Sequence, residues 1–259
     1  LRENEEMDYT ANNLNQYAQR TIPDGVDVLG SAGTGTTVTV NDLPTSRYGP
    51  YWYQALTVTN AGAAVWQAVN VVGVYNPPDT NEPDVVSSET GHVFVAQTPE
   101  VFTYDDDGNL LSDGRFSYTW DGENRLIGVE TLTNLPASVP RVKLEFTFDY
   151  MSRRVGKTVY TWDSESWILA ADSRFLYDGW NLIQERSTLD APPSTNYCVW
   201  GLDLSGSLQG AGGIGGLLAA RLGTNNVCYT YDANGNVSEL LLSTAYGPQS
   251  PACSLGSPP

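Results

Sequence analysis

Hydrophobic and polar residues alternate through much of the chain, and this pattern predicts short β-strands. Aromatic residues recur at every second position in the pairs Phe102/Tyr104, Tyr118/Trp120, Phe146/Phe148 and Tyr229/Tyr231, and residues 36–40, 51–58 and 65–72 are also typical of short strands. Neighbouring side chains of a strand point to opposite faces of a sheet, so a period of two is typical of strands with one buried face. No stretch has the apolar spacing of three and four over three turns that predicts a helix. We therefore expect an all-β fold.

A seven-residue motif recurs five times and predicts a series of β-hairpins. Each copy has an aromatic residue, an Asp, two variable residues, a Gly, Asn or Ser, a polar residue and an apolar one, which comes one place late in the third copy. The Asp can accept hydrogen bonds from backbone N–H groups two residues on, and the Gly or Asn supplies the positive φ of a tight turn. The copies begin at Tyr104, Trp120, Phe148, Tyr177 and Tyr231, and a degenerate copy without the Asp lies in residues 9–15.

These tyrosine–aspartate copies resemble the YD repeats of RHS ("rearrangement hotspot") proteins. Residues 197–213, Thr98-Pro99-Glu100 and the segment 244–248 also resemble RHS chains. The resemblance covers residues 8–25 and 97–248, and it implies successive hairpins in a curved or spiralling sheet, as part of a bacterial β shell around a C-terminal toxin or other cargo. It further implies a secreted or surface location. We expect the C-terminal part of such a shell, as a mature product or a piece of a longer chain, without the distal core that follows Gly247 in the family and without the toxin.

The motif positions predict four regions along the chain. We expect the degenerate repeat in residues 1–25, a β-rich insertion in 26–96, the sheet of repeat hairpins in 97–244 and a Pro/Ser/Gly-rich tail in 245–259. A partial shell leaves open sheet edges, which favour pairing with another strand. We therefore expect the partner to be the rest of the parent chain or another copy.

Composition narrows the classes of function. With 13 basic and 30 acidic residues, the net charge is −17. This acidity opposes nucleic acids and anionic lipid surfaces, which need clustered Lys and Arg. No run of 18 apolar residues predicts a membrane helix. The single His92 and the spacing of Cys198, Cys228 and Cys253 match no zinc motif, so we expect no metal or cofactor and leave the disulfide pairing open.

Four aromatic residues of the insertion are candidates for carbohydrate binding. Flat aromatic rings stack on the apolar C–H faces of sugars. Because alternate strand residues face inward, the alternative interpretation is an ordinary β core. The candidates are Tyr51, Trp52, Tyr53 and Trp66.

The repeat aspartates define an enzymatic alternative to the structural role. Glycoside hydrolysis needs only two positioned carboxylates. The repeat brings Asp105, Asp121, Asp149, Asp178 and Asp232 into consideration, although we expect each to cap its own turn and expect no catalytic residue. The acidic run at residues 105–109, with Asp113 beyond it, has the oxygen density of a calcium loop, but its Gly is not at the position an EF-hand requires.

Overall fold

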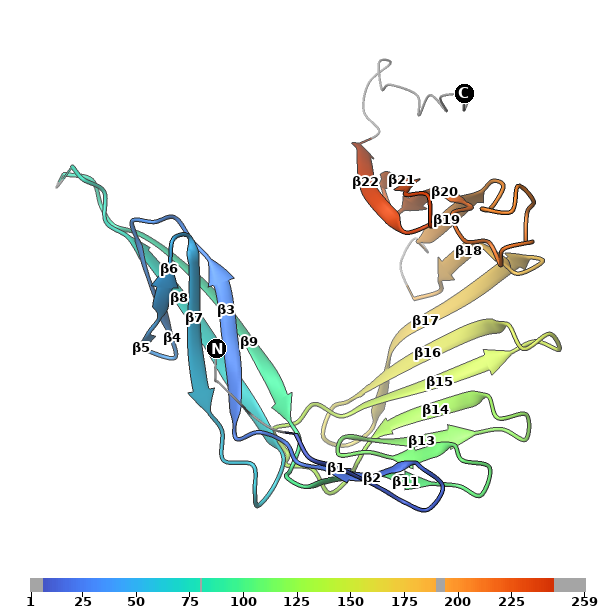
Figure 1. Ribbon diagram of the computed structural model, residues 1–259, viewed down its shortest axis with the longest axis horizontal. Coiled ribbons are helices and arrows are strands. Elements are labelled where there is room, and N and C mark those ends of the chain that lie inside the picture. The colour runs from blue at the N-terminus through green and yellow to red at the C-terminus, as the bar shows by residue number, and fades with distance from the viewer. Residues whose placement is uncertain (1–6, 80, 190–193, 245–259) are drawn as a thin grey trace. The chain divides into compact units, whose positions relative to one another are not determined.

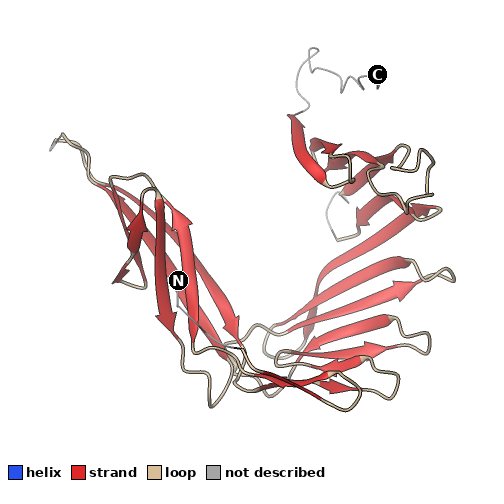
Figure 2. Ribbon diagram, viewed as in Figure 1, coloured by secondary structure: helices blue, strands red, loops and turns tan. Residues whose placement is uncertain are grey.

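The computed structural model describes residues 7–79, 81–189 and 194–244, and this part of the chain consists of strands and turns (Figure 2). The all-β fold of successive antiparallel hairpins expected from the sequence is confirmed. No helix in the described part is long and apolar enough to cross a membrane. The tail expected in residues 245–259 lies outside the described residues.

Most strands of the described residues are labelled in Figure 1. They are β1 Tyr9–Ala11, β2 Tyr17–Arg20, β3 Gly25–Ser31, β4 Thr36–Val40, β5 Leu43–Pro44, β6 Ser46–Tyr48, β7 Tyr51–Thr57, β8 Val65–Tyr75, β9 Val85–Val95, β10 Glu100–Val101, β11 Thr103–Tyr104, β12 Leu110–Ser112, β13 Phe116–Trp120, β14 Leu126–Thr131, β15 Val142–Phe148, β16 Arg154–Trp162, β17 Trp167–Asp178, β18 Asn181–Ser187, β19 Thr195–Trp200, β20 Leu217–Leu222, β21 Asn225–Tyr231 and β22 Val237–Thr244.

The largest sheet contains β11 to β22 in strict sequence order. Each inner strand pairs with the one before it and the one after it, and β11 and β22 are the end strands, so the sheet is a meander of hairpins. The register shifts by one residue at Tyr104, Phe148, Tyr177 and Tyr231, which are the aromatic residues that directly precede a motif Asp. Such a bulge bends the strand and redirects its side chains. The aromatic residue and the Asp of the motif therefore form one local structure, a bulge followed by a turn.

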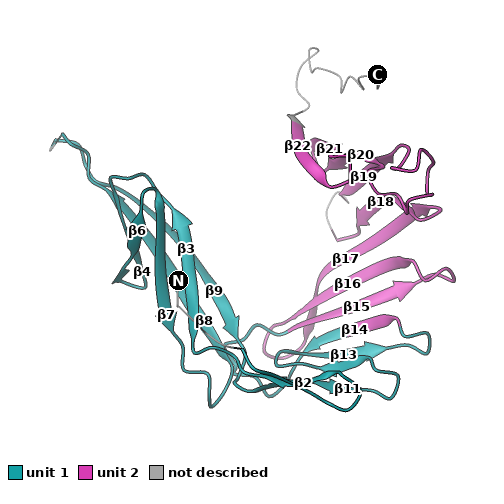
Figure 3. Cartoon of the chain, in the orientation of Figure 1, with its two compact units in different colours: residues 1–124, 129–141 teal, residues 125–128, 142–259 magenta. Residues whose placement is uncertain are grey.

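The chain consists of two compact units, which Figure 3 shows in different colours. Unit 1 comprises Leu1–Asn124 and Val129–Arg141, and unit 2 comprises Arg125–Gly128 and Val142–Pro259. In unit 1, β1, β2 and β10 form a small sheet beside the first repeat hairpins, where β10 pairs with β2.

Residues 25–95 of unit 1 form two further sheets, with strand orders β3-β7-β6 and β5-β4-β8-β9. Between them lies an apolar core of Val38, Val40, Trp52 and Leu56, against which Val28 and Val71 pack. The core residues alternate along β4 and β7, because inward and outward positions alternate on a strand. Burial of these apolar side chains stabilises the sandwich.

Asn60 ties together the two chain segments that enter and leave this sandwich. Its side chain is 1 % exposed, and its Nδ2 donates to the carbonyl oxygens of Ile22, Pro23 and Ala96 at 3.0 to 3.3 Å. Nearby, the Arg20 guanidinium pairs with the buried carboxylate of Glu100. Buried polar groups of this kind are stable because they are hydrogen-bonded.

Unit 2 contains the strands from β15 to β22 and a Gly-rich loop, residues 201–216, between β19 and β20. Ala220 and Val227 are its buried apolar side chains among the described residues. Cys198 is a free, half-buried thiol, and burial together with the charge of Glu185 raises its pKa. Cys253 lies outside the described residues.

Candidate functional site

The motif aspartates organise a turn of one recurring geometry, which we call the Asp turn. At Asp149, Oδ1 accepts the backbone N–H groups of Met151 at 2.9 Å and Arg153 at 3.0 Å. Asp232 makes the same two bonds with Asn234 and Asn236, both at 2.9 Å. In each turn the residue three places after the Asp has positive φ, as in Gly108, Asn124, Ser152 and Gly235. The motif thus encodes the turn through an acceptor and a residue that tolerates the left-handed region.

Two further Asp turns lie where the sequence pattern is incomplete. Asn12 accepts the N–H groups of Leu14 and Gln16, and Asn15 has a φ of 61°, so the degenerate copy has the full geometry with Asn as the acceptor. Asp203 accepts the Ser205 N–H at 2.9 Å, and Gly206 has a φ of 74°. At both places the motif's aromatic residue is missing, because Ala11 and Leu202 directly precede the acceptor. A simpler pattern, an Asp or Asn followed three places later by Gly or Asn, identifies both turns in the sequence.

The fourth motif copy does not form an Asp turn. Asp178 pairs directly with Asn181, so a two-residue turn joins β17 to β18. The positive φ, 56°, belongs to Gly179 rather than to the third residue after the Asp. Gly at the first turn position favours this tighter hairpin connection, so the expectation of one common turn geometry is wrong for this copy.

The Asn12 turn joins β1 to β2 in the small sheet, whereas the turns of the five motif copies and the Asp203 turn lie at one end of the large sheet. They connect an odd-numbered strand to the next even-numbered strand, and in a sequential antiparallel meander such connections share an end. The repeat therefore brings Asp105, Asp121, Asp149, Asp178 and Asp232 to the same end of the sheet, each in its own turn.

Side chains connect the turns of the first four motif copies in series, and we call this series of contacts the turn ladder. In unit 1, Asn109 Nδ2 donates to Asn124 Oδ1 at 2.8 Å. In unit 2, Arg125 Nη1 donates to the carbonyl of Asp149 at 3.3 Å, and Arg153 Nη1 donates to the carbonyl of Gly179. Asn109, Arg125 and Arg153 each follow their motif Asp by four residues. One motif position thus supplies the link between turns.

The motif aromatics add a second set of contacts between hairpins. Trp120 Nε1 donates to the carbonyl of Leu110 at 2.8 Å, and the Tyr177 hydroxyl donates to the carbonyl of Arg154 at 3.0 Å. Both acceptors lie in the preceding repeat. Arg153 in turn lies over the Tyr177 ring, 5.3 Å from its centroid. A ring with a polar tip can cover an apolar surface and still hydrogen-bond, which explains Tyr and Trp at this position.

The environment of three motif carboxylates favours their ionised form, as the pKa of each shows. The Asn109 side chain holds the pKa of Asp105 below its ordinary value, and Asn236 does the same for Asp232. For Asp149, burial opposes ionisation, but Arg153 and two backbone N–H groups outweigh it and lower the pKa. A glycosidase acid needs the opposite shift, a raised pKa. The described residues contain no group of three or more His, Cys, Asp or Glu side chains that could hold a metal ion.

The four candidate carbohydrate-binding aromatics lie in three different environments. Trp52 is in the sandwich core and 8 % exposed, so its ring is not available to a ligand. Tyr51 and Tyr53 flank it on β7 and therefore face the other side of the sheet. Trp66 belongs to the other sheet, where it stacks on His92 with ring centroids 5.4 Å apart. The structure does not bring the four together.

A surface of tyrosines covers the outer face of the β3-β7-β6 sheet, and we call it the tyrosine face. Tyr48 pairs with Tyr51 across β6 and β7, and Leu29 pairs with Tyr53 across β3 and β7. Residues paired in this way point to the same face. Tyr48 is 88 % exposed and Tyr51 65 %, while the Tyr53 hydroxyl donates to Asp27 at 3.0 Å. Tyr48 and Leu29 are not apparent from the sequence, because only the strand pairing places them beside Tyr51 and Tyr53.

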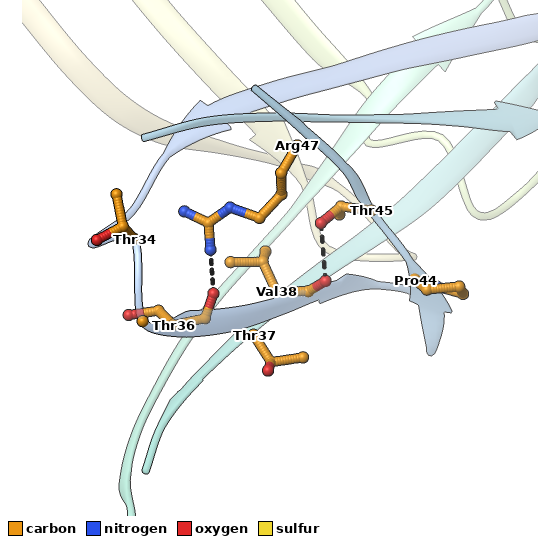
Figure 4. A pocket seen from close by; sticks show the side chains of 8 residues that line it. Thr34, Thr36, Thr37, Val38, Pro44, Thr45 and Arg47 are labelled. Atoms are coloured by element: carbon orange, nitrogen blue, oxygen red, sulfur yellow. Dashed lines mark hydrogen bonds between the residues drawn. The ribbon is translucent and has the colours of Figure 1, made fainter. Parts of the chain in front are cut away.

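A small pocket at one end of the sandwich, of about 290 Å³, is shown in Figure 4. Threonines and Arg47 line it. Arg47 donates to the carbonyl oxygens of Ala32 and Gly33 at 2.8 and 3.0 Å, and also to that of Thr36. Its donors therefore bind the protein's own backbone, and this arginine serves the fold.

Comparison with known proteins identifies no family for the chain. No family model matches it, and no curated protein matches it. One solved structure to which it is similar is TcdB2-TccC3 without its hypervariable C-terminal region, with a TM-score of 0.30 and 14 % sequence identity. The match covers 92 % of this chain but 15 % of that one, so the chain spans a small part of its length. A likeness of this degree assigns neither family nor activity.

Proposed function

We propose that the chain is a wall segment of a β shell of the RHS type, in a bacterial protein that is secreted or held at the cell surface. In this proposal its role is structural, to enclose a cargo. The observation that carries it is the turn ladder, in which one motif position links turn to turn along a sheet of sequential hairpins. An isolated hairpin is marginally stable, so a wall built of hairpins needs such links.

The alternative of a glycoside hydrolase has less support. Three motif carboxylates accept hydrogen bonds within their own turns, and their pKa values are lowered: those of Asp105, Asp149 and Asp232. These groups act as acceptors in the fold, and a proton donor with a raised pKa is absent from this set.

The partner in this proposal is the rest of the parent chain or another copy, which would pair with β22. This strand stands at the end of the strand order, so one of its sides has no neighbour within the described sheet. Its Leu240, Leu241 and Leu242 are 58, 51 and 73 % exposed, which leaves apolar residues on both faces. A long apolar edge strand of this kind is a template for further pairing.

Sedimentation velocity over a range of concentrations tests the wall proposal. We expect reversible self-association of the whole chain, and we expect Leu240→Lys with Leu242→Lys to abolish it, because charged side chains block edge pairing. The matched control is Leu14→Lys with Leu208→Lys, two exposed leucines outside the strands. A chain that stays monomeric throughout, or association that both double variants retain, contradicts pairing at β22.

A second candidate function, carbohydrate binding, is favoured by the tyrosine face. Exposed rings lie beside Asp27 and the hydroxyls of Ser31 and Ser46, which occupy the same face by register. Rings stack on sugar C–H surfaces while carboxylates and hydroxyls bond sugar hydroxyls. Arg47 on β6 points to the opposite side, since it pairs with Trp52. We therefore propose a neutral glycan as the ligand.

Native gel electrophoresis in the presence of soluble neutral polysaccharides tests this binding. We expect cellulose- or xylan-derived polymers to retard the chain, and Tyr51→Ala to weaken the effect about 5–10-fold through the lost ring contact. Tyr150→Ala is the control, because Tyr150 is a 91 % exposed tyrosine outside this face. The proposal is contradicted if no polymer retards the chain, or if the Tyr51→Ala variant is retarded as much as the unaltered chain.

A further inference from the structure

Arg115 is held in a cage of three aromatic rings in unit 1. Its guanidinium carbon lies 4.8 Å from the centroid of Phe94, 4.9 Å from that of Phe116 and 5.5 Å from that of Trp66. Each is within the range of a cation–π interaction, so the rings fix the position of the charge. Such contacts occupy ring faces and use none of the guanidinium's directional hydrogen bonds.

The hydrogen-bond donors of this guanidinium have no acceptor among the described residues. Its buried Nε has no hydrogen-bond partner, and within the described part of the chain its side chain forms no ion pair. Arginine carries five N–H donors in a fixed fork that suits a carboxylate or phosphate. A buried donor without a partner is unfavourable, and an unplaced ligand is one of its recognised explanations. Arg47, whose guanidinium donates to three carbonyl oxygens, shows the contrast.

Arg115 lines an open pocket of about 430 Å³, a size typical of small-molecule sites. Its walls are mostly apolar and include Ile22, Val26, Val93 and Phe116. The cavity lies among residues of unit 1 alone.

The other charged groups of the pocket already have partners. Arg20 pairs with Glu100, and Glu100 also accepts the Gly114 N–H at 3.1 Å. Asp113 accepts the N–H groups of Arg115 and Phe116 at 2.7 Å and the Tyr118 hydroxyl at 2.6 Å. Burial, together with the bond to Asp113, raises the pKa of Tyr118, so this phenol keeps its proton. Within the described residues, Arg115 is the charged side chain of this lining whose charged group has neither an ion pair nor a hydrogen bond.

We propose that this pocket binds a small carboxylic acid with an apolar body. The carboxylate accepts hydrogen bonds from the fork of Arg115, and the aryl or alkyl body lies against Val26 and Val93. Charge-assisted bonds of this kind are the strong ones, and the rings position the guanidinium before the ligand arrives. The acidity of the chain, −17 overall, favours a ligand with a single carboxylate over a polyanion.

Isothermal titration of the whole chain with benzoate and hexanoate tests this site. We expect benzoate to bind with a Kd of about 0.1–1 mM, as its few atoms allow. Benzamide, which has the same shape without the charge, is expected to bind at least about tenfold more weakly, and Arg115→Gln is expected to weaken benzoate by the same factor. Arg221→Gln is the control, an exposed arginine of unit 2 that changes the net charge equally.

A second variant keeps the test decisive if Arg115→Gln does not fold. Val93 lines the pocket and is 39 % exposed, so Val93→Trp fills the cavity at a position that tolerates bulk. We expect this variant to weaken benzoate about tenfold while Arg115 stays in place. The proposal is overturned if neither acid binds at millimolar concentration, or if benzoate binds Val93→Trp as it binds the unaltered chain.

Discussion

A single carboxylate can hold a long loop, and Asp203 does this for the Gly-rich loop of unit 2. Its side chain is 6 % exposed and accepts the Ser205 hydroxyl and the N–H groups of Ser205, Ala211 and Gly213. These hydrogen bonds, the one from the Ser205 hydroxyl above all, lower the pKa of Asp203 to about 2. Burial acts in the opposite direction but is outweighed. The ionised form is therefore part of the folded loop.

Replacing this charge makes the stability of the chain depend less on pH. Because the folded-state pKa is depressed, the carboxylate stabilises the fold above its unfolded pKa of about 4, and this contribution is lost as pH falls toward 2. We expect Asp203→Asn to lower the melting temperature at pH 7. The difference from the unaltered chain should narrow steadily between about pH 4 and pH 2.

Thermal unfolding from pH 2 to pH 7 measures this difference. Asp178→Asn is the control, since Asp178 is an exposed aspartate of unit 2 in a two-residue turn. A gap between Asp203→Asn and the unaltered chain that stays constant down to pH 2 would show that the ionised carboxylate is not what holds the loop.

At the scale of the hairpin, the motif could be interpreted from sequence because its parts are local. The Asp, the positive-φ residue and the alternating strands all lie within about ten residues, so turn chemistry and strand period predict them. Asp149 with Ser152 is an example. Asp178 departs because Gly179 allows a tighter turn, and local chemistry alone does not decide between two allowed turns.

Contacts between hairpins are not visible in the sequence, because they join residues far apart along the chain. Arg153 reaches Gly179, 26 residues away, and neither residue signals the other. The same holds for the side of a strand that meets the core. The alternation predicts that Trp52 and Tyr51 face opposite ways, but which of them is buried depends on where the second sheet packs. Which residues share a surface therefore depends on how the strands pair, as the tyrosine face shows.

At the scale of the whole molecule, the two units share one structural principle. In both, an Asp turn closes a hairpin and a side chain four residues on reaches a neighbouring turn. Repeats that contact mainly their neighbours gain stability from each interface, so one link affects the hairpins on either side. We infer that the turn ladder couples the stability of successive hairpins, as the proposed wall requires.

Hydrogen exchange of the Arg153→Met variant measures this coupling between hairpins. Arg153 pairs with Asp149 at 2.7 Å and donates to Gly179 in the next turn, so its loss should loosen both hairpins. We predict about tenfold faster exchange at backbone amides of β17 and β18 as well as in the Asp149 turn. Arg186→Met, which removes an exposed arginine within β18, should produce no such spread. Faster exchange confined to the Asp149 turn, or no change, would contradict the coupling of hairpins.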